Sequence, residues 1–386
     1  MKTKACKVLV TLHLMVFLVF WITSCGGSSN GSGGGTGGGT GGPSAGEYLW
    51  EFSLTDSNLY FSTVNSSTGQ LGTPTLSEGI ACNSLGTIPS IAIAPSNKFA
   101  FVIDNCFSGI HVYSMKAPGL SLGEILRSPY FFPSSVDSIA MDPSGKFLYA
   151  IGSPGIIYQI PVNGSTGELS LATTTVEAAD FREVVVDPSG RFIFANDLTG
   201  GRIFAYLIVG ASLSPVPGSP FTVPANGQPA NFVMESNGKF LYAPLLSGGV
   251  AGFAVNSSTG TLSDIPGSPF PTITQPFAVA ADPSGRFLYS IGGNLNSSIE
   301  GFSLDTSTGA LTTMVGSPFS TQSSLSSLVV DPSGHFLYAT VQATTLPDSK
   351  IYGFAIDASN GSLTNLVTSP YPAPPFPVNL VSLNIP

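Results

Sequence analysis

A short apolar segment, a polar turn and a second apolar segment form the pattern that recurs most clearly along the chain. In one copy, the turn Asp187-Pro188-Ser189-Gly190-Arg191 stands between Val186 and Phe192-Ile193-Phe194. Copies of this turn also begin at residues 94, 142, 235, 282 and 331, so successive copies are 45 to 49 residues apart. A period in the high forties that carries short strands is typical of β-propellers, in which each repeat forms one blade.

Each period contains four segments of strand length. Ser138–Met141 and Phe147–Ala150 are apolar, and the Asp-Pro-Ser-Gly turn between them places proline and glycine where a type I turn favours them. Ile156–Val162 follows, and the turn Asn163–Gly167 leads to a fourth segment, Glu168–Leu171. Four short segments with tight turns predict a four-stranded antiparallel blade.

The two ends of the chain complete one further blade. Seven outer turns, most of the Asn-Ser-Ser-Thr-Gly kind, accompany only six of the Asp-Pro-Ser-Gly kind. Tyr48-Leu49-Trp50 matches a second strand, and Val378-Asn379-Leu380-Val381 matches a first strand. The predicted fold is therefore all-β: a seven-bladed β-propeller of four-stranded antiparallel blades over residues 47–386. The C-terminal strand closes the ring and leaves no open sheet edge in it.

The first 46 residues differ in character from the repeats. A basic start and the apolar run Val8–Ile22 predict a secretory signal peptide over residues 1–25. Ile22-Thr23-Ser24-Cys25 resembles the bacterial lipobox, whose cysteine becomes lipidated; the alternative is an ordinary signal peptide with an incidental cysteine. Residues 26–46 are almost wholly Gly, Ser and Thr and predict a flexible tether. We therefore expect an exported lipoprotein, attached to a membrane through Cys25, at the outer membrane or the cell surface.

Composition narrows the classes of partner. Charged residues make up 9% of the chain, and the formal net charge is −9 with no cluster of basic side chains. This balance argues against binding to nucleic acid. The three histidines show no spacing typical of a metal site, so we expect neither a metal nor a cofactor. We expect a monomer.

The repeated turns and strands resemble a known family. An apolar strand, Asp-Pro-Ser-Gly-Lys/Arg-Phe-Leu-Tyr, Asn-Ser-Ser-Thr-Gly and Gly-Ser-Pro-Phe together resemble the lactonase-like, YVTN-type β-propellers, which include propeller-type 6-phosphogluconolactonases. The resemblance covers about residues 47 to 386. It implies a seven-bladed propeller and, more weakly, hydrolysis of lactones, because the matching residues belong to turns and core rather than to a site.

A site is expected on the face of the ring opposite the repeated turns, which we call the loop face. Loops between second and third strands, and loops that lead into the next blade, lie there and vary most. The blade that both termini build is counted as the first, and the best polar cluster then falls in the fourth. Asp180, Arg182 and Glu183 lie where the chain enters the first strand of this blade. Asp197 and Arg202 flank the loop between its second and third strands.

The family resemblance bears on this cluster in two ways. The family usually carries histidines before the first strand of this blade and an Asp-Leu-Gly run in the next loop. Asn196-Asp197-Leu198-Thr199-Gly200 resembles that run, whereas Phe181-Arg182-Glu183 stands in place of the histidines. Glu183 with Arg182 could activate water or stabilise an oxyanion. The alternative is an ion pair that caps the end of a strand.

Two cysteines fall in loops on the loop face of the second blade. Cys82 lies in the loop that enters this blade, and Cys106 lies between its second and third strands. Because an exported chain reaches an oxidising compartment, we predict a disulfide between them. The alternative is two unpaired cysteines.

Two functions follow from these features. The first is a cell-envelope binding or scaffold protein, with a protein or carbohydrate ligand at the loop face and no catalysis. It rests on the predicted anchor, the sparsely charged loop face and the missing histidines. The second is a lactonase-like hydrolase, which rests on the family resemblance and the Asp197 loop.

Overall fold

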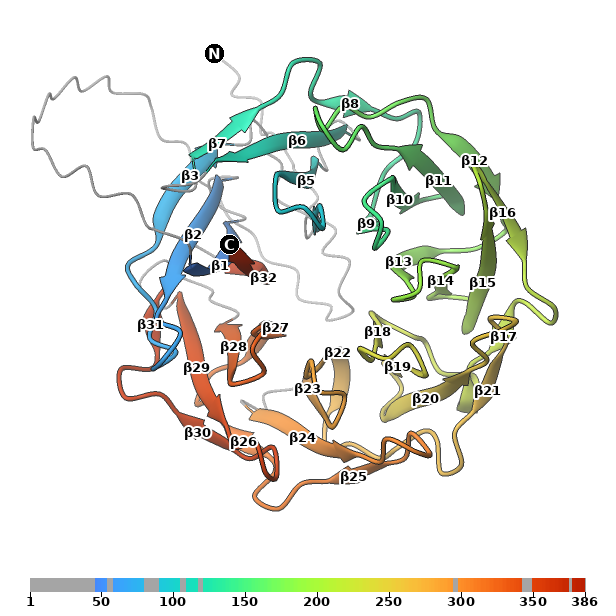
Figure 1. Cartoon of the computed structure of the whole chain (residues 1–386). Helices are drawn as coiled ribbons and strands as arrows, with labels where there is room; N and C mark the ends of the chain where they lie inside the picture. The colour runs from blue at the N-terminus through green and yellow to red at the C-terminus, as the bar shows by residue number, and fades with distance from the viewer. Residues whose placement is uncertain are drawn as a thin grey trace, which may run out of the picture.

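Seven antiparallel sheets surround a central axis in the computed structural model of the chain (Figure 1). The structure describes residues 46–53, 58–79, 90–104, 109–116, 121–293, 298–341, 349–374 and 377–385. In blades 2 to 7 the strands follow one another in chain order from the centre to the rim. The prediction of an all-β, seven-bladed propeller is confirmed.

From the centre outward, four strands make up the main path of each sheet. Blade 1 holds β32 (Pro377–Ile385), β1 (Gly46–Ser53), β2 (Asn58–Val64) and β3 (Thr75–Gly79). Blade 2 holds β4 (Ile91–Ile93), β5 (Phe99–Asp104), β6 (Gly109–Lys116) and β7 (Ser121–Glu124), with β8 (Tyr130–Phe131) also on β6. Blade 3 holds β9 (Ser138–Met141), β10 (Phe147–Gly152), β11 (Ile156–Pro161) and β12 (Thr173–Val176). Blade 4 holds β13 (Phe181–Val186), β14 (Phe192–Asp197), β15 (Arg202–Val209) and β16 (Ser212–Pro215), with β17 (Phe221–Thr222) also on β15.

The remaining three blades follow the same order. A short 3-10 helix, η1 (Pro224–Asn226), precedes blade 5, which holds β18 (Val233–Met234), β19 (Phe240–Pro244), β20 (Val250–Val255) and β21 (Leu262–Asp264). Blade 6 holds β22 (Gln275–Ala281), β23 (Phe287–Gly293), β24 (Ser298–Leu304) and β25 (Leu311–Thr313), with β26 (Phe319–Ser320) also on β24. Blade 7 holds β27 (Leu325–Val330), β28 (Phe336–Val341), β29 (Lys350–Ile356) and β30 (Leu363–Asn365), with β31 (Tyr371–Pro372) also on β29.

Both ends of the chain meet in blade 1, as predicted. β32 is its innermost strand and pairs antiparallel with β1, so that Trp50 lies opposite Val381. β32 also contacts β27 and β28 of blade 7. The last strand therefore completes the first blade and packs against the last one, which closes the ring.

The recurring Asp-Pro-Ser-Gly turn is held by its acidic side chain. Asp187 is buried, and its carboxylate accepts hydrogen bonds from the backbone N–H of Ser189 at 3.1 Å, Arg191 at 2.7 Å and Phe192 at 2.6 Å. Gly190 has a φ of 68°, a conformation that favours glycine. The acid thus satisfies the N–H groups that the tight turn leaves without strand partners. Its role is structural.

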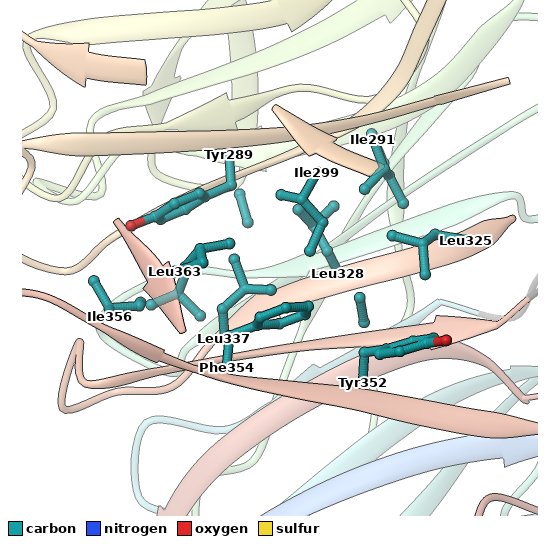
Figure 2. Packing of buried hydrophobic residues seen from close by; sticks show 14 of the residues in the cluster. Tyr289, Ile291, Ile299, Leu325, Leu328, Leu337, Tyr352, Phe354, Ile356 and Leu363 are labelled. Atoms are coloured by element: carbon teal, nitrogen blue, oxygen red, sulfur yellow. The ribbon is translucent and has the colours of Figure 1, made fainter. Parts of the chain in front are cut away.

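Apolar side chains fill the space between neighbouring blades. The cluster between blades 6 and 7 includes Tyr289, Ile299, Leu337 and Phe354, which interdigitate from facing sheets (Figure 2). The middle strands are apolar on both faces because each blade is sandwiched between two others. Phe192 to Asp197 in β14 are all buried, as this sandwich requires.

One predicted strand lies elsewhere. The fourth strand of blade 3 is Thr173–Val176 rather than Glu168–Leu171. Leu169 forms only a single bridge with Val162, because its side chain is buried as part of the core of blades 2 and 3.

Several sequence predictions lie outside the described residues. They are the signal peptide at 1–25, the tether up to residue 45, the lipid-attachment site Cys25 and the predicted disulfide of Cys82 and Cys106. β1 starts at Gly46, one residue before the expected start of the propeller. Within the described ranges, no helix has the length and apolar character needed to span a membrane.

Candidate active site at the loop face of blades 3 to 5

The inner strands start at the loop face and run toward the repeated turns. We call their starting ends, grouped around the central axis, the ring mouth. Polar side chains connect neighbouring inner strands there. The Ser90 hydroxyl accepts a hydrogen bond from the backbone N–H of Ile139 at 3.2 Å, and the Ser327 hydroxyl accepts one from Leu380 at 3.3 Å. The ring mouth is thus a polar rim above an apolar core.

A β-bulge opens the inner strand of blade 4. Phe181 lies opposite Asp197 and Val184 lies opposite Ala195, so both Arg182 and Glu183 face the single residue Asn196. Backbone N–H groups of Arg182 and Glu183 donate to the Asn196 side-chain oxygen at 3.0 and 2.6 Å. Bulges of this kind redirect side chains and are frequent beside active sites.

Asn196 also fixes the approach to blade 5. It is fully buried, and its amide nitrogen donates to the backbone carbonyl of Pro229 at 2.8 Å and to that of Ala230. One amide therefore holds the bulge of blade 4 and the segment that leads to Asn231 at a fixed separation. This places the starting ends of two neighbouring inner strands beside each other.

Asp197 and Arg202 brace the loop of blade 4. The Asp197 carboxylate, 1% exposed, accepts hydrogen bonds from the backbone N–H of Asp180 and of Gly200, both at 3.0 Å. Its second oxygen lies 2.5 Å from an Arg202 guanidinium nitrogen. The Arg202 guanidinium also lies 5.3 Å from the centre of the Phe204 ring. The Asp197–Arg202 pair therefore ties the second-to-third loop to the start of the inner strand.

Arg182 pairs with Asp180 and keeps one donor unused. An Arg182 Nη lies 2.8 Å from an Asp180 carboxylate oxygen, with both side chains partly exposed. The Arg182 Nε is buried and has no hydrogen-bond partner among the described residues. A buried guanidinium N–H without a partner is rare in folded proteins, and it is a donor available to a bound molecule.

Glu183 lies beside the inner strand of blade 3. Protein surrounds its carboxyl near the centre of the ring, and this burial raises the pKa of Glu183 to about 8. The Ser138 hydroxyl at the start of β9 lies near enough to oppose that shift, although it is not in hydrogen-bonding geometry and has no partner within the described chain. A carboxyl with a pKa near neutrality is suited to proton transfer.

The matching family model is that of the lactonases, described as seven-bladed β-propellers, and it matches residues 176–378. The chain belongs to this family. The match includes the loop face of blade 4 and most of the residues described above. It also includes the whole of blades 5 to 7.

Solved structures of similar proteins share this lactonase fold. A periplasmic gluconolactonase of Pseudomonas aeruginosa superposes with a TM-score of 0.73 at 18% identity, covering 89% of this chain and 100% of that protein. A proposed 6-phosphogluconolactonase of Bacteroides fragilis superposes with a TM-score of 0.74 at 18% identity, covering 88% and 98%. A third, from Bacteroides uniformis, gives 0.72 at 19% identity, covering 87% and 99%. No curated protein matches the chain.

The five residues predicted for the site of this lactonase-family chain fall into two groups. Asp180, Arg182 and Glu183 lie at the ring mouth, whereas Asp197 and Arg202 form the brace behind it. The structure therefore brings the five residues together, but only the first three lie at the ring mouth. Their catalytic roles stay a prediction.

Sequence reasoning missed two side chains at the ring mouth. Ser138 and Asn231 each carry a buried polar atom without a partner in the described part of the chain. A sequence signal existed. Four residues before the first residue of each repeated turn, at or near the start of the inner strand, five of six copies carry a polar residue: Ser90, Ser138, Glu183, Asn231 and Ser327.

The two histidines within the described ranges lie away from the ring mouth. His111 lies in the outer half of blade 2, where its Nδ1 is 2.6 Å from Glu124, and that carboxylate also accepts a hydrogen bond from Ser128. His335 contacts Ser333 in a repeated turn on the opposite face. Among the described residues, no group of three or more His, Cys, Asp or Glu could hold a metal ion.

Proposed function

We propose that this protein is a lactone hydrolase whose active site is the ring mouth of blades 3 to 5. The observation that carries the proposal is the pairing, on one β-bulge, of Glu183 with an Arg182 that has an unused Nε donor. Membership of the lactonase family supports it. This function takes precedence over a purely binding role, because the described ring mouth holds groups that ring opening needs.

Each group has a defined part in the reaction. Hydrolysis adds water to the lactone carbonyl carbon, passes through a tetrahedral oxyanion and breaks the ring C–O bond to give a hydroxy acid. Ionised Glu183 takes the proton from the attacking water and, as the acid, returns it to the ring oxygen as that bond breaks. The Arg182 Nε–H stabilises the oxyanion, as a fixed donor does in a site of low dielectric.

The brace behind the ring mouth sets the geometry of these groups. Asn196 fixes the backbone of both reacting residues, and Asp197 fixes Asp180, which in turn orients Arg182 through their ion pair. Rigid supports of this kind lower the reorganisation needed as charge develops. Asn196 and Asp197 are therefore positioning residues.

Hydrolysis of a panel of γ- and δ-lactones by the purified full-length protein tests the proposal. We expect rates above the spontaneous background, and a fall in kcat/KM of about 100-fold in Glu183→Gln and in Arg182→Ala. Glu168→Gln is the matched control, because Glu168 lies beside an outer turn on the opposite face. Rates equal to background for every lactone would leave only the binding or scaffold role.

The cellular place of this activity is part of the proposal. The predicted leader and Cys25 support a lipoprotein that holds the propeller at the outer membrane or cell surface through the 26–46 tether. Labelling with a fatty acid analogue should mark the wild type and spare Cys25→Ala. Titration of free thiols in the denatured, unreduced protein should find Cys82 and Cys106 unreactive if they are bonded.

A further inference from the structure

The distribution of cations in the chain bears on the charge of the substrate. The sequence holds 13 Lys and Arg residues, three of which precede Val8 in the leader. Of the remaining ten, five occupy the repeated turns on the face opposite the ring mouth: Lys98, Lys146, Arg191, Lys239 and Arg286. Lys116 ends a third strand and so lies toward the same turn face, and Arg127 follows the outer strand β7.

Three cations are left on the loop face, and none is free at the ring mouth. Arg182 is paired with Asp180, and Arg202 is paired with the buried Asp197. Lys350 opens the third strand of blade 7 and pairs in register with Pro372 on the outer side, so the second strand separates it from the axis. The loops that the structure leaves undescribed contain no Lys or Arg at all.

Acidic groups outnumber these cations on the same face. Asp137 precedes the inner strand of blade 3, Glu177 lies in the segment that leads to blade 4, and Asp180 and Asp197 pair with the two arginines. Glu183, whose pKa burial raises to about 8, adds a full negative charge only above that pH. A site with this balance does not favour anions, because both arginines described there are already paired with carboxylates and no unpaired Lys or Arg side chain lies at the described ring mouth to hold a phosphate.

Two uncharged polar groups at the ring mouth are suited to a substrate with hydroxyl groups rather than to a charged one. The Asn231 Oδ1 is a buried acceptor and the Ser138 Oγ is a buried hydroxyl, and neither has a partner among the described residues. An acceptor and a hydroxyl of this kind bind the hydroxyl groups of a sugar-derived ring. A buried polar atom of this kind gains a hydrogen bond when a ligand supplies one.

We propose that the ring mouth takes an uncharged polyhydroxy lactone and discriminates against phosphorylated or carboxylated ones. This inference rests on the proposed hydrolase function and deepens it by naming the substrate class. It distinguishes between the two activities named for the similar structures, a gluconolactonase and a 6-phosphogluconolactonase. The basis is the charge at the ring mouth of this chain.

Two probes separate the possibilities: glucono-δ-lactone and its 6-phosphate, assayed with the full-length protein. We expect kcat/KM for the neutral lactone to exceed that for the phosphate by at least about tenfold at low ionic strength. Added salt should raise the rate with the phosphate and leave the rate with the neutral lactone unchanged, because salt screens repulsion of the anion alone. Asp180→Asn, which releases Arg182 from its ion pair, should lower the ratio of kcat/KM for the neutral lactone to kcat/KM for the phosphate.

The outcomes distinguish this inference from the function on which it rests. Faster hydrolysis of the phosphate, with a rate that falls as salt is added, would overturn the charge argument and leave the hydrolase function standing. No hydrolysis of either lactone would overturn both.

A second comparison tests recognition of hydroxyl groups. Asn231→Ala should lower kcat/KM for glucono-δ-lactone by about fivefold, the effect of one lost hydrogen bond, and should leave δ-valerolactone, which has no hydroxyl groups, unaffected. Equal losses with both lactones would show that Asn231 only supports the fold and would overturn its role in binding.

Discussion

The Tyr338 hydroxyl donates a hydrogen bond to the backbone carbonyl of Gly69 at 2.7 Å, across 269 residues of sequence and across the join between the last blade and the first. Two interfaces inside the chain contain the same bond, from Tyr242 to Gly309 and from Tyr289 to Gly361, each at 2.7 Å. The join is therefore built like the interfaces between blades that follow each other in sequence.

Tyr338→Phe should destabilise the protein by about 1 to 2 kcal/mol, because it leaves the Gly69 carbonyl buried without its partner. Unfolding in urea, followed by tyrosine and tryptophan fluorescence, measures the change. Tyr289→Phe is the matched control, since it removes the same bond inside the chain. A loss in Tyr289→Phe with none in Tyr338→Phe would mean that the ring is not closed in this way.

Removal of Phe376 to Pro386 should leave the protein unfolded or aggregated. β32 supplies the inner strand of blade 1, and without it β1 exposes an unpaired edge beside a hydrophobic interface. Thermal unfolding and size-exclusion chromatography measure the result. Deletion of Pro386 alone, which follows β32, is the control and should leave the Tm unchanged. A truncated protein that kept the wild-type Tm would refute closure by the last strand.

Gly309→Ala should destabilise the propeller by about 2 kcal/mol or more. Gly309 has a φ of 77°, and an added Cβ would lie 2.5 Å from Phe240 of the preceding blade. Gly164→Ala is the control, because a Cβ there meets nothing within 4 Å and its φ lies outside the left-handed region. The control should change the free energy of unfolding by no more than about 0.5 kcal/mol. Similar losses in both variants would contradict the close contact between blades.

Stability should fall as pH rises, through two acids in β1. Glu51 is fully buried, accepts a hydrogen bond from the Ser62 hydroxyl at 3.0 Å, and has its pKa raised by burial to about 8. Burial and the neighbouring Asp331 of blade 7 raise the pKa of Glu47 to about 7. Both groups bind protons more tightly in the folded protein than in the unfolded chain, where the ordinary value is 4.5.

Linkage gives the sign of this effect. The stability that these protonated acids contribute is complete below about pH 4.5 and is lost as pH rises through 7 to 8. Each group contributes a slope of at most about 1.4 kcal/mol per pH unit. Glu51→Gln should flatten the fall and make the variant more stable than the wild type at pH 8.5. Parallel profiles of the free energy of unfolding against pH would show that Glu51 is ionised in the folded protein.

The fold was predictable because it repeats. Asp187 and its five counterparts form turns from local hydrogen bonds alone, so their spacing marks the blades without knowledge of tertiary contacts. The fourth strand of blade 3 was placed too early, since the burial of Leu169 depends on the neighbouring blade. Local turns can be recognised from sequence, whereas contacts between blades cannot.

The candidate site was predictable only in part. The departures of Asp180, Arg182 and Glu183 from the repeat predicted a polar cluster at the loop-face end of blade 4, and the structure places the three residues there. The sequence did not show that Arg182 and Glu183 lie together at the ring mouth while Asp197 and Arg202 pair behind them. That arrangement depends on the β-bulge opposite Asn196, which no local sequence pattern marks. Ser138 and Asn231 escaped notice because a lone polar residue at the start of an apolar strand resembles an ordinary strand end.

The dependence of kcat/KM on pH for a hydrolysed lactone tests the central claim, that Glu183 acts as the base at the ring mouth. Because burial raises the pKa of Glu183 to about 8, the enzymatic rate above the spontaneous background should rise with pH and level off above that value. Glu183→Gln should lose both most of the rate and the rise. A variant with the wild-type rate and the wild-type pH profile would contradict the account.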